Sequence, residues 1–186
     1  MEAWNVADPQ IEFVFGRVDD ALKAELQAFW LKHQGAYQSE IKAFRALSDR
    51  ELTPLSLLPR PLRRQPATIA RSAAGEVIGI IFVVLRELEP SLDLGSHAYF
   101  LRIYVLPSER KCKLTNRLFK AFLNGFDDDP QRRDYRAKIL IAENVNPGLQ
   151  QAFMRRYFAR LGFRMLGSNN LGGEVWTRKL QTSFVF

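Results

Sequence analysis

Alternating apolar and polar residues mark the first candidate strands. Residues 11–15 alternate as a strand with one buried face does. Residues 67–71 and 77–85 flank a turn that contains Gly75, and the second run is apolar on both faces. This pattern predicts an antiparallel hairpin whose second strand lies inside a sheet. Further strands are predicted at 99–105, from Ile139 onward, at 163–166 and at 174–180, the last two as a final hairpin.

Helical spacing separates these strands. Asp19 or Asp20 can cap a helix, because a carboxylate accepts hydrogen bonds from the free N–H groups of a first turn. The apolar positions on one face of this helix are Leu22, Leu26, Phe29 and Trp30. A second short helix is predicted over 39–47, an amphipathic helix after the strand at 99–105, and another before Gly162. The predicted order is β-α-α-β-β-β-α-β-α-β-β.

Residues 53–66 contain four prolines, each of which fixes φ and removes a backbone donor. We expect an extended loop there, either a solvated connector or a segment that faces a substrate. No internal repeat interrupts the chain, and 47% of its residues are hydrophobic. Residues 1–186 are therefore expected to form one domain.

Charge and cysteine content narrow the function. The net charge is +7 and the pI is near 9.8, with arginine well in excess of lysine, so an anionic ligand or partner is expected. With Cys112 as the one cysteine and only two histidines, neither a disulfide nor a zinc site is expected. The N-terminal sequence does not resemble a signal peptide, and no apolar run is long enough to cross a membrane. We expect a cytoplasmic protein.

The segment after the strand at 99–105 has the pattern of an anion site. The strand leads through Pro107 into a basic turn with Arg110, Lys111 and Lys113, and then into the amphipathic helix. The first N–H groups of a helix lack intrahelical acceptors and carry the positive end of its dipole. Strand, basic turn and helix together are typical of phosphate binding.

This segment resembles the acetyl-CoA motif of the GCN5-related N-acetyltransferase (GNAT) superfamily, which reads roughly Val-x-Pro-x-x-(Arg/Gln)-x-x-Gly-x-(Gly/Ala). Val105, Pro107 and Arg110 match the motif, whereas Lys113 and Thr115 occupy its two small positions. A second segment is similar to the family's later strand, Asn-headed helix and Tyr-x-x-Leu-Gly-Phe ending. It runs from Ile139 through Asn146 to Gly162 and Phe163, with Phe158 at the usual tyrosine position and Tyr157 just before it.

The resemblance implies an α/β (α+β) fold: a mixed, mostly antiparallel sheet flanked by helices on both faces. It also implies an acyl-CoA-dependent N-acyltransferase that uses acetyl-CoA or another acyl-CoA. In this family two strands part, and the free backbone groups of Ile103 and Val105 would bind the pantetheine arm. The cofactor-binding residues implied are Ile103, Val105, Arg110, Lys111, Cys112, Lys113, Leu114 and Thr115.

The same resemblance nominates residues for the chemistry. Tyr157 is the candidate acid for the leaving thiolate; alternatively, Leu149, Phe153, Tyr157 and Leu161 form a core stripe with a period of four. Asn146 is a helix cap that in the family also contacts the cofactor. The strand at 99–105 offers no carboxylate, so the base is left open between Glu143 and His97. Arg102 and Tyr104, on the strand face opposite Ile103, are candidate substrate residues.

Two other functions stay open. Lysine and threonine at the small positions could fill the cofactor groove, which would leave a basic module that binds nucleic acid or protein. A transferase that acts on nucleic acid combines both readings, with phosphate contacts from Arg60, Arg63, Arg64, Arg132, Arg133, Arg155 and Arg156. The amine acceptor is not specified by the sequence, nor is the choice between monomer and homodimer.

Overall fold

The computed structural model describes residues 8–46, 64–110, 112–169 and 172–181. Within these residues the chain forms a seven-stranded sheet with the order β1-β2-β3-β4-β5-β7-β6. All neighbouring strands are antiparallel except β4 and β5, which are parallel. The strands are β1 Gln10–Phe13, β2 Gln65–Arg71, β3 Val77–Glu87, β4 His97–Val105, β5 Ala137–Asn144, β6 Arg164–Ser168 and β7 Glu174–Lys179.

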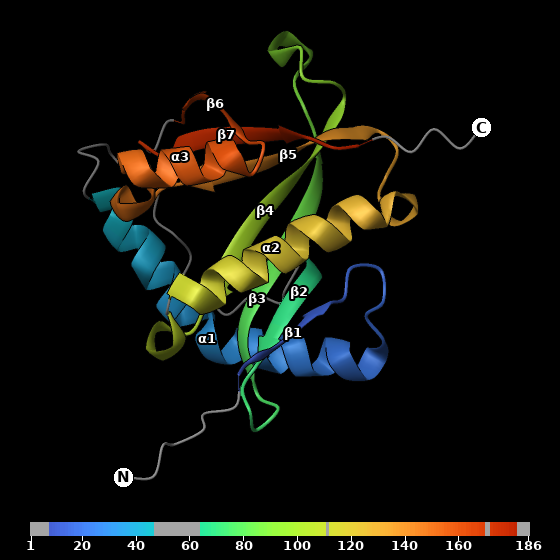
Figure 1. Ribbon diagram of the computed structural model, residues 1–186, viewed down its shortest axis with the longest axis vertical. Coiled ribbons are helices and arrows are strands. Elements are labelled where there is room, and N and C mark those ends of the chain that lie inside the picture. The colour runs from blue at the N-terminus through green and yellow to red at the C-terminus, as the bar shows by residue number, and fades with distance from the viewer. Residues whose placement is uncertain (1–7, 47–63, 111, 170–171, 182–186) are drawn as a thin grey trace.

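Helices cover both faces of this sheet (Figure 1). Helices α2 (Cys112–Asp128) and α3 (Ala152–Arg160) lie on one face, and α1 (Asp20–Ala46) lies on the other. Short 3₁₀ turns precede or follow several elements: η1 Pro90–Leu92, η2 Pro107–Glu109, η3 Pro130–Arg132 and η4 Pro147–Gln150. The predicted fold class is therefore confirmed. No helix in the described part of the chain is both long and apolar enough to span a membrane.

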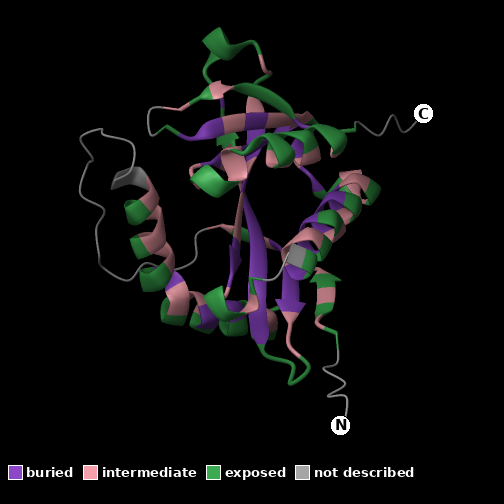
Figure 2. Ribbon diagram, turned by 60° about the vertical axis from the view of Figure 1, so that its left-hand side comes forward, coloured by how far each residue is buried: buried purple, intermediate pink, exposed green. Residues whose placement is uncertain are grey.

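The core is divided by the sheet, and buried positions concentrate along its central strands (Figure 2). On the α2 side, Leu118 and Phe122 pack against Leu101. On the α1 side, Leu26 and Phe29 pack against the ring of Tyr104. Successive side chains of a strand point to opposite faces, so β4 has one apolar face toward α2 and one mixed face toward α1, as its sequence predicts.

The parallel strands β4 and β5 separate before they end. Their register stops at the pair Leu101 and Ala142, whereas β4 continues to Val105 and β5 to Asn144. The N–H of Leu106 donates to the carbonyl of Ile78 on β3. Because backbone groups alternate in direction along a strand, those of Val105 and of Ile103 point to the other side, toward the opening.

Two glycines bring α2 close to the sheet. A β-carbon on Gly125 of α2 would lie 2.3 Å from Cγ of Phe13, which is impossibly short. A β-carbon on Gly79 of β3 would lie 3.2 Å from Val105 and 3.3 Å from the Leu118 side chain of α2. The absence of side chains at these positions lets α2 lie directly against β1 and β3.

Several local predictions are confirmed. The carboxylate of Asp19 accepts a 2.8 Å hydrogen bond from the N–H of Leu22 and so caps α1. Leu26 and Phe29 are buried on the predicted face of α1. Strands β2 and β3 form the predicted antiparallel hairpin, and β3 lies in the interior of the sheet.

Other predictions were wrong. Residues 39–46 do not form a separate helix. They are the last part of α1, which runs unbroken from Asp20 to Ala46 because its sequence contains no proline to end it. Of the predicted loop at 53–66, residues up to 63 lie outside the described residues, and Gln65 and Pro66 belong to β2. The predicted core stripe holds only in part: Tyr157 and Leu161 pack against the core, whereas Phe153, in the first turn of α3, is 60% exposed.

Candidate active site at the strand opening

The N-terminal turn of α2 lies at the end of the strand opening. Strand β4 leads through η2 into Cys112, the first residue of α2. The side chain of Lys113 is exposed and that of Thr115 is half-buried, so neither side chain is fully buried in the core. Leu114 is buried in the α2-side core, which leaves only its backbone available to a ligand. Lys111 lies outside the described residues.

Arg110 is already engaged within the protein. Its Nε donates to the carbonyl of Val105 at 2.9 Å, and its guanidinium pairs with both carboxylate oxygens of Glu40 on α1. It also lies over the ring of Tyr104, 5.8 Å from the centroid. The Glu40 hydrogen bond raises the pKa of Arg110. Its side chain therefore links α1 to the end of β4 and does not extend in front of α2.

A second ion pair crosses the opening from strand to strand. Arg102 is the first residue of β4 beyond the paired region, and its guanidinium donates to Glu143 of β5. Asn169 makes a longer hydrogen bond of 3.4 Å to the other oxygen of Glu143. Burial alone would raise the pKa of Glu143, but the charge and hydrogen bond of Arg102 outweigh it and lower that pKa. A carboxylate held in this way is a weak base.

Tyr157 lies between α3 and α2. Its phenol donates a 2.5 Å hydrogen bond to Oδ1 of Asn116, in the second turn of α2. Burial raises its pKa, so the phenol carries its proton at neutral pH. Phe158, at the position where the family has its tyrosine, is buried in the core between Phe119 and Trp176.

Asn146 acts as a cap, but of η4 rather than of α3. Its Oδ1 accepts a 2.9 Å hydrogen bond from the N–H of Gly148. Helix α3 begins separately at Ala152, without a side-chain cap. The predicted Asn-headed helix is therefore two elements, and this division moves Asn146 away from the start of α3.

Comparison with known proteins identifies the arrangement of the fold. No protein-family model matches the chain, and no curated protein matches it by sequence. An acetyltransferase of the GNAT family from Streptococcus pneumoniae matches 94% of this chain and 100% of its own, with a TM-score of 0.55 and 12% identity. A candidate acetyltransferase from Salmonella typhimurium, yncA, solved with its cofactor acetyl-CoA, matches 97% and 98%, with a TM-score of 0.52 and 12% identity. A GCN5-related N-acetyltransferase from Kribbella flavida matches 92% and 98%, with a TM-score of 0.50 and 18% identity. The chain has the GNAT fold.

On this GNAT fold, three buried polar atoms beside the opening have no hydrogen-bond partner among the described residues. They are Nδ2 of Asn144 at the end of β5, the hydroxyl of Tyr104 on β4, and one terminal nitrogen of Arg64 just before β2. A buried donor without an acceptor costs about 1–3 kcal/mol, so such atoms are rare in stable cores. Arg64 was a candidate by sequence only as a phosphate contact, and Asn144 was not a candidate, although an asparagine that ends an apolar strand is a signal.

His33 is another residue that the sequence did not nominate. It lies on α1, with its ring 4.7 Å from that of Phe29 and 6.3 Å from that of Tyr104. Burial, helped by the charge of Lys32, lowers its pKa, so the imidazole is neutral at neutral pH. His97, by contrast, starts β4 five residues before Arg102, about 16 Å from the opening.

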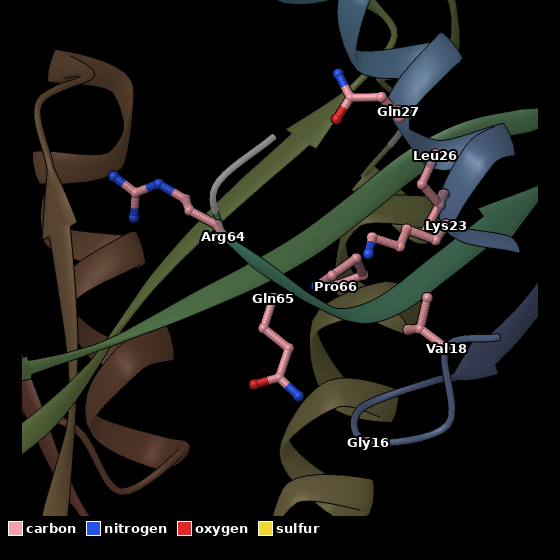
Figure 3. A pocket seen from close by; sticks show the side chains of 8 residues that line it. All are labelled: Gly16, Val18, Lys23, Leu26, Gln27, Arg64, Gln65 and Pro66. Carbon is pink, nitrogen blue, oxygen red and sulfur yellow. The ribbon is translucent and has the colours of Figure 1, made fainter. Parts of the chain in front are cut away.

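One pocket among the described residues lies between the β1–α1 loop, α1 and the start of β2. It has a volume of about 370 Å³ and is lined by residues from the β1–α1 loop, the first turns of α1 and the start of β2. Figure 3 shows the Arg64 guanidinium directed away from Lys23 and Gln27. The aliphatic part of the Arg64 side chain therefore lines this pocket, whereas its guanidinium points away from it.

Three of the arginines proposed to contact nucleic acid are engaged within the described part of the protein. Arg133 is buried and donates to the carbonyl of Gln181, and Arg155 pairs with buried Glu174. Arg132 pairs with Asp129. Arg60 and Arg63 lie outside the described residues, and Arg156 is exposed on α3. Within the described ranges, no group of three or more His, Cys, Asp or Glu side chains is arranged to hold a metal ion.

Proposed function

We propose that the protein is an acyl-CoA-dependent N-acyltransferase that transfers an acetyl or related acyl group to an amine. One observation carries the proposal: β4 and β5 part directly in front of the N-terminus of α2. A helix N-terminus binds phosphate, and free strand edges bind an amide-containing chain. Acyl-CoA has both parts in this order. The GNAT fold adds support, since the Salmonella protein of this fold was solved with acetyl-CoA.

The residues at the opening fit this cofactor. The backbone groups of Ile103 and Val105 point toward it, although Arg110 occupies the Val105 carbonyl. The buried amide of Asn144, at the end of β5, has a free donor that suits a carbonyl oxygen. The exposed side chain of Lys113 adds charge at the first turn of α2, where glycine would instead allow close backbone approach.

Two side chains would move protons. Bound acyl-CoA supplies the acyl group as an activated thioester. We assign His33 as the base that takes a proton from the ammonium of the acceptor, because its imidazole is neutral and lies beside Tyr104 on the mixed face of β4. We assign Tyr157 as the acid that protonates the leaving thiolate, because its phenol is protonated and lies against α2. Glu143 is a weaker choice of base, because Arg102 lowers its pKa.

Calorimetric titration with CoA tests the proposal. Wild-type protein should bind CoA, and at 100 times the dissociation constant the ligand should stabilise the fold by about 2.7 kcal/mol. Lys113→Glu reverses a charge at the first turn of α2 and should abolish binding, with the unfolding midpoint unchanged. Lys120→Glu, at an exposed position later in the same helix, is the matched control and should bind normally. Equal CoA affinity in the two variants would remove the phosphate role of this turn.

A second candidate function is a GNAT-like binding module without acyl transfer. The two ion pairs favour it: Glu40 holds Arg110, and the pair of Arg102 with Glu143 crosses the opening. Both would have to accommodate a cofactor. No stabilisation by CoA at millimolar concentration, together with binding of nucleic acid that weakens as salt rises, would support this module over the transferase.

A further inference from the structure

On the α1 side of the opening, the positive charges of the arginines outnumber the carboxylates that neutralise them. Arg64 interacts electrostatically with Arg86, Arg102 and the carboxylate of Glu143, and Glu143 also interacts with Arg86 and Arg102. Arg102 takes that carboxylate in a direct pair. The other two arginines have no ion-pair partner among the described residues. This cluster, named here the arginine cluster, therefore carries a net charge of about +2.

Arg64 is the member whose burial is hardest to explain. One of its terminal nitrogens is buried and has no acceptor in the described part of the chain. Its guanidinium lies over the ring of Phe82, 5.6 Å from the centroid, and burial lowers its pKa. A buried donor on a cation costs more without an acceptor than one on a neutral group, so the described residues leave this nitrogen without the partner that its burial calls for.

The cluster is aligned with the point where the strands part. Phe82 of β3 is the register partner of Arg102 on β4, and Arg102 pairs across the opening with Glu143 on β5. The guanidinium of Arg64 lies over Phe82 in this row and interacts electrostatically with Arg102 and Glu143. Arg86 lies over Phe100 on the same face. An anion held by Arg64 would lie a short distance from the mouth of the opening.

The chemistry around this row favours a carboxylate on a small molecule. A guanidinium forms a planar fork that matches a carboxylate with two hydrogen bonds, and Arg102 already makes a carboxylate pair one strand away. Aromatic rings border the row, with Trp30 in edge contact with Phe82 and in contact with Tyr37. Such a site, a few polar groups beside aromatic rings, suits a small ligand better than an extended polyanion.

We propose that Arg64, supported by Arg86, binds a carboxylate of the amine acceptor, so that the acceptors of this protein are amino-acid-like molecules. The inference rests on the proposed acyltransferase function, because that function supplies the reason for an amine to bind beside the opening. It adds the acceptor class, which the fold does not give. Its test must be able to fail separately from the test of CoA binding.

The experiment measures equilibrium binding and turnover with matched probes. Each set contains an amino acid, its carboxamide and the amine without the carboxyl group, for example phenylalanine, phenylalaninamide and phenethylamine. One set is prepared for each type of side chain. Phosphoethanolamine is the phosphate probe. Acids should bind at least about tenfold more tightly than their amides, the effect expected for a charged hydrogen-bonded pair. With acetyl-CoA, the same ratio should appear in kcat/KM.

Arg64→Gln is the decisive variant and should remove the preference for acids over amides. Arg156→Gln, at an exposed arginine of α3, makes the same charge change outside the cluster and should keep it. Equal binding of acids and amides, no binding of either at 10 mM, or a preference that survives Arg64→Gln would overturn the proposal. Stronger binding of phosphoethanolamine would overturn the assignment to carboxylates. Acid preference in binding without any CoA binding would refute the acyltransferase proposal and the acceptor role together, and leave a carboxylate-binding protein.

Discussion

Tyr99 and Tyr104 lie on the same strand, β4, and show how its two ends differ. Both side chains are buried, and burial raises the pKa of each phenol. The hydroxyl of Tyr99, at the paired end, accepts a 2.8 Å hydrogen bond from the N–H of Asp134. The hydroxyl of Tyr104, at the open end, has no partner in the described residues. The buried phenol of Tyr99 therefore has a hydrogen-bond partner where β4 is paired with β5, whereas that of Tyr104 has none in the described residues where the two strands have parted.

The surroundings of the two tyrosines contain both paired and unpaired polar groups. Near Tyr99, Asp134 also pairs with Arg136, and Leu140 of β5 fills the core beside it. At the open end, one nitrogen of Arg64 and one of Asn144 lack partners among the described residues, and near Tyr99 one nitrogen of Arg133 does too. We expect the polar groups at the paired end to contribute mainly to stability and those at the open end to ligand binding. The predictions below test this division.

The largest effect is expected at the paired end. Leu140 is fully buried, and Leu140→Ala should lower the free energy of unfolding by about 2–5 kcal/mol through lost burial and a cavity. Urea unfolding measures it. Leu92→Ala, at a position 48% exposed, should change that free energy by no more than about 0.5 kcal/mol. A small effect at Leu140 would mean that this end is not the core that holds the strands together.

At the open end, activity should fall without loss of stability. Tyr157→Phe removes the assigned acid and should lower kcat by at least about 100-fold, the usual lower range for general acid catalysis. The free energy of unfolding should change by about 1 kcal/mol, because one hydrogen bond to Asn116 is lost. Tyr135→Phe, at an 83% exposed tyrosine, is the control. Undiminished turnover in Tyr157→Phe would return Tyr157 to a purely packing role.

The pH dependence should locate the base. His33 must be neutral to accept a proton, and burial lowers its pKa below the ordinary 6.5. The value of kcat/KM should therefore be constant near neutral pH and fall about tenfold per unit once the pH drops below that lowered pKa. His33→Gln should abolish this limb, and His97→Gln, the matched change at the other histidine, should keep it. An acid limb that persists in His33→Gln would exclude His33 as the base.

The smallest effect compares the two tyrosines directly. Tyr99→Phe leaves the N–H of Asp134 without its acceptor and should cost about 1 kcal/mol of unfolding free energy. Tyr104→Phe removes a buried hydroxyl that has no partner, so it should be neutral or slightly stabilising. Both are measured by thermal and urea unfolding. Equal losses in the two variants would mean that the Tyr104 hydroxyl has a partner and that the two ends do not differ in this respect.

The sequence predicted what local patterns control. The apolar run of β3 predicted that this strand lies inside the sheet. The cap of α1 by Asp19 was also predictable, because a cap is a hydrogen bond within the first turn of the helix. The error at 39–47 was also local: a glycine and polar residues do not end a helix when no proline follows. Phe153 was misplaced because it lies in the first turn of α3, where the stripe that packs Tyr157 and Leu161 against the core does not extend.

The candidate site depended on contacts between distant residues, which no pattern in a single sequence reveals. Glu40 meets Arg110 across 70 positions, and Arg102 meets Glu143 across 41. These pairs decide that Arg110 is already engaged and that Glu143 is a weak base. The role of His33 follows from the packing of α1 against β4, so the histidine became a candidate only in the structure.

The two glycines under α2 have a consequence for how fast a ligand associates. Close approaches at Gly79 and Gly125 let the helix pack against β3 and β1 at two separate points, and we expect this packing to restrain the helix. The N–H groups of its first turn are consequently aimed before any ligand arrives, and little ordering entropy is lost on binding. Association should then be limited by diffusion and charge steering rather than by a rearrangement of α2, with a rate that falls as ionic strength rises.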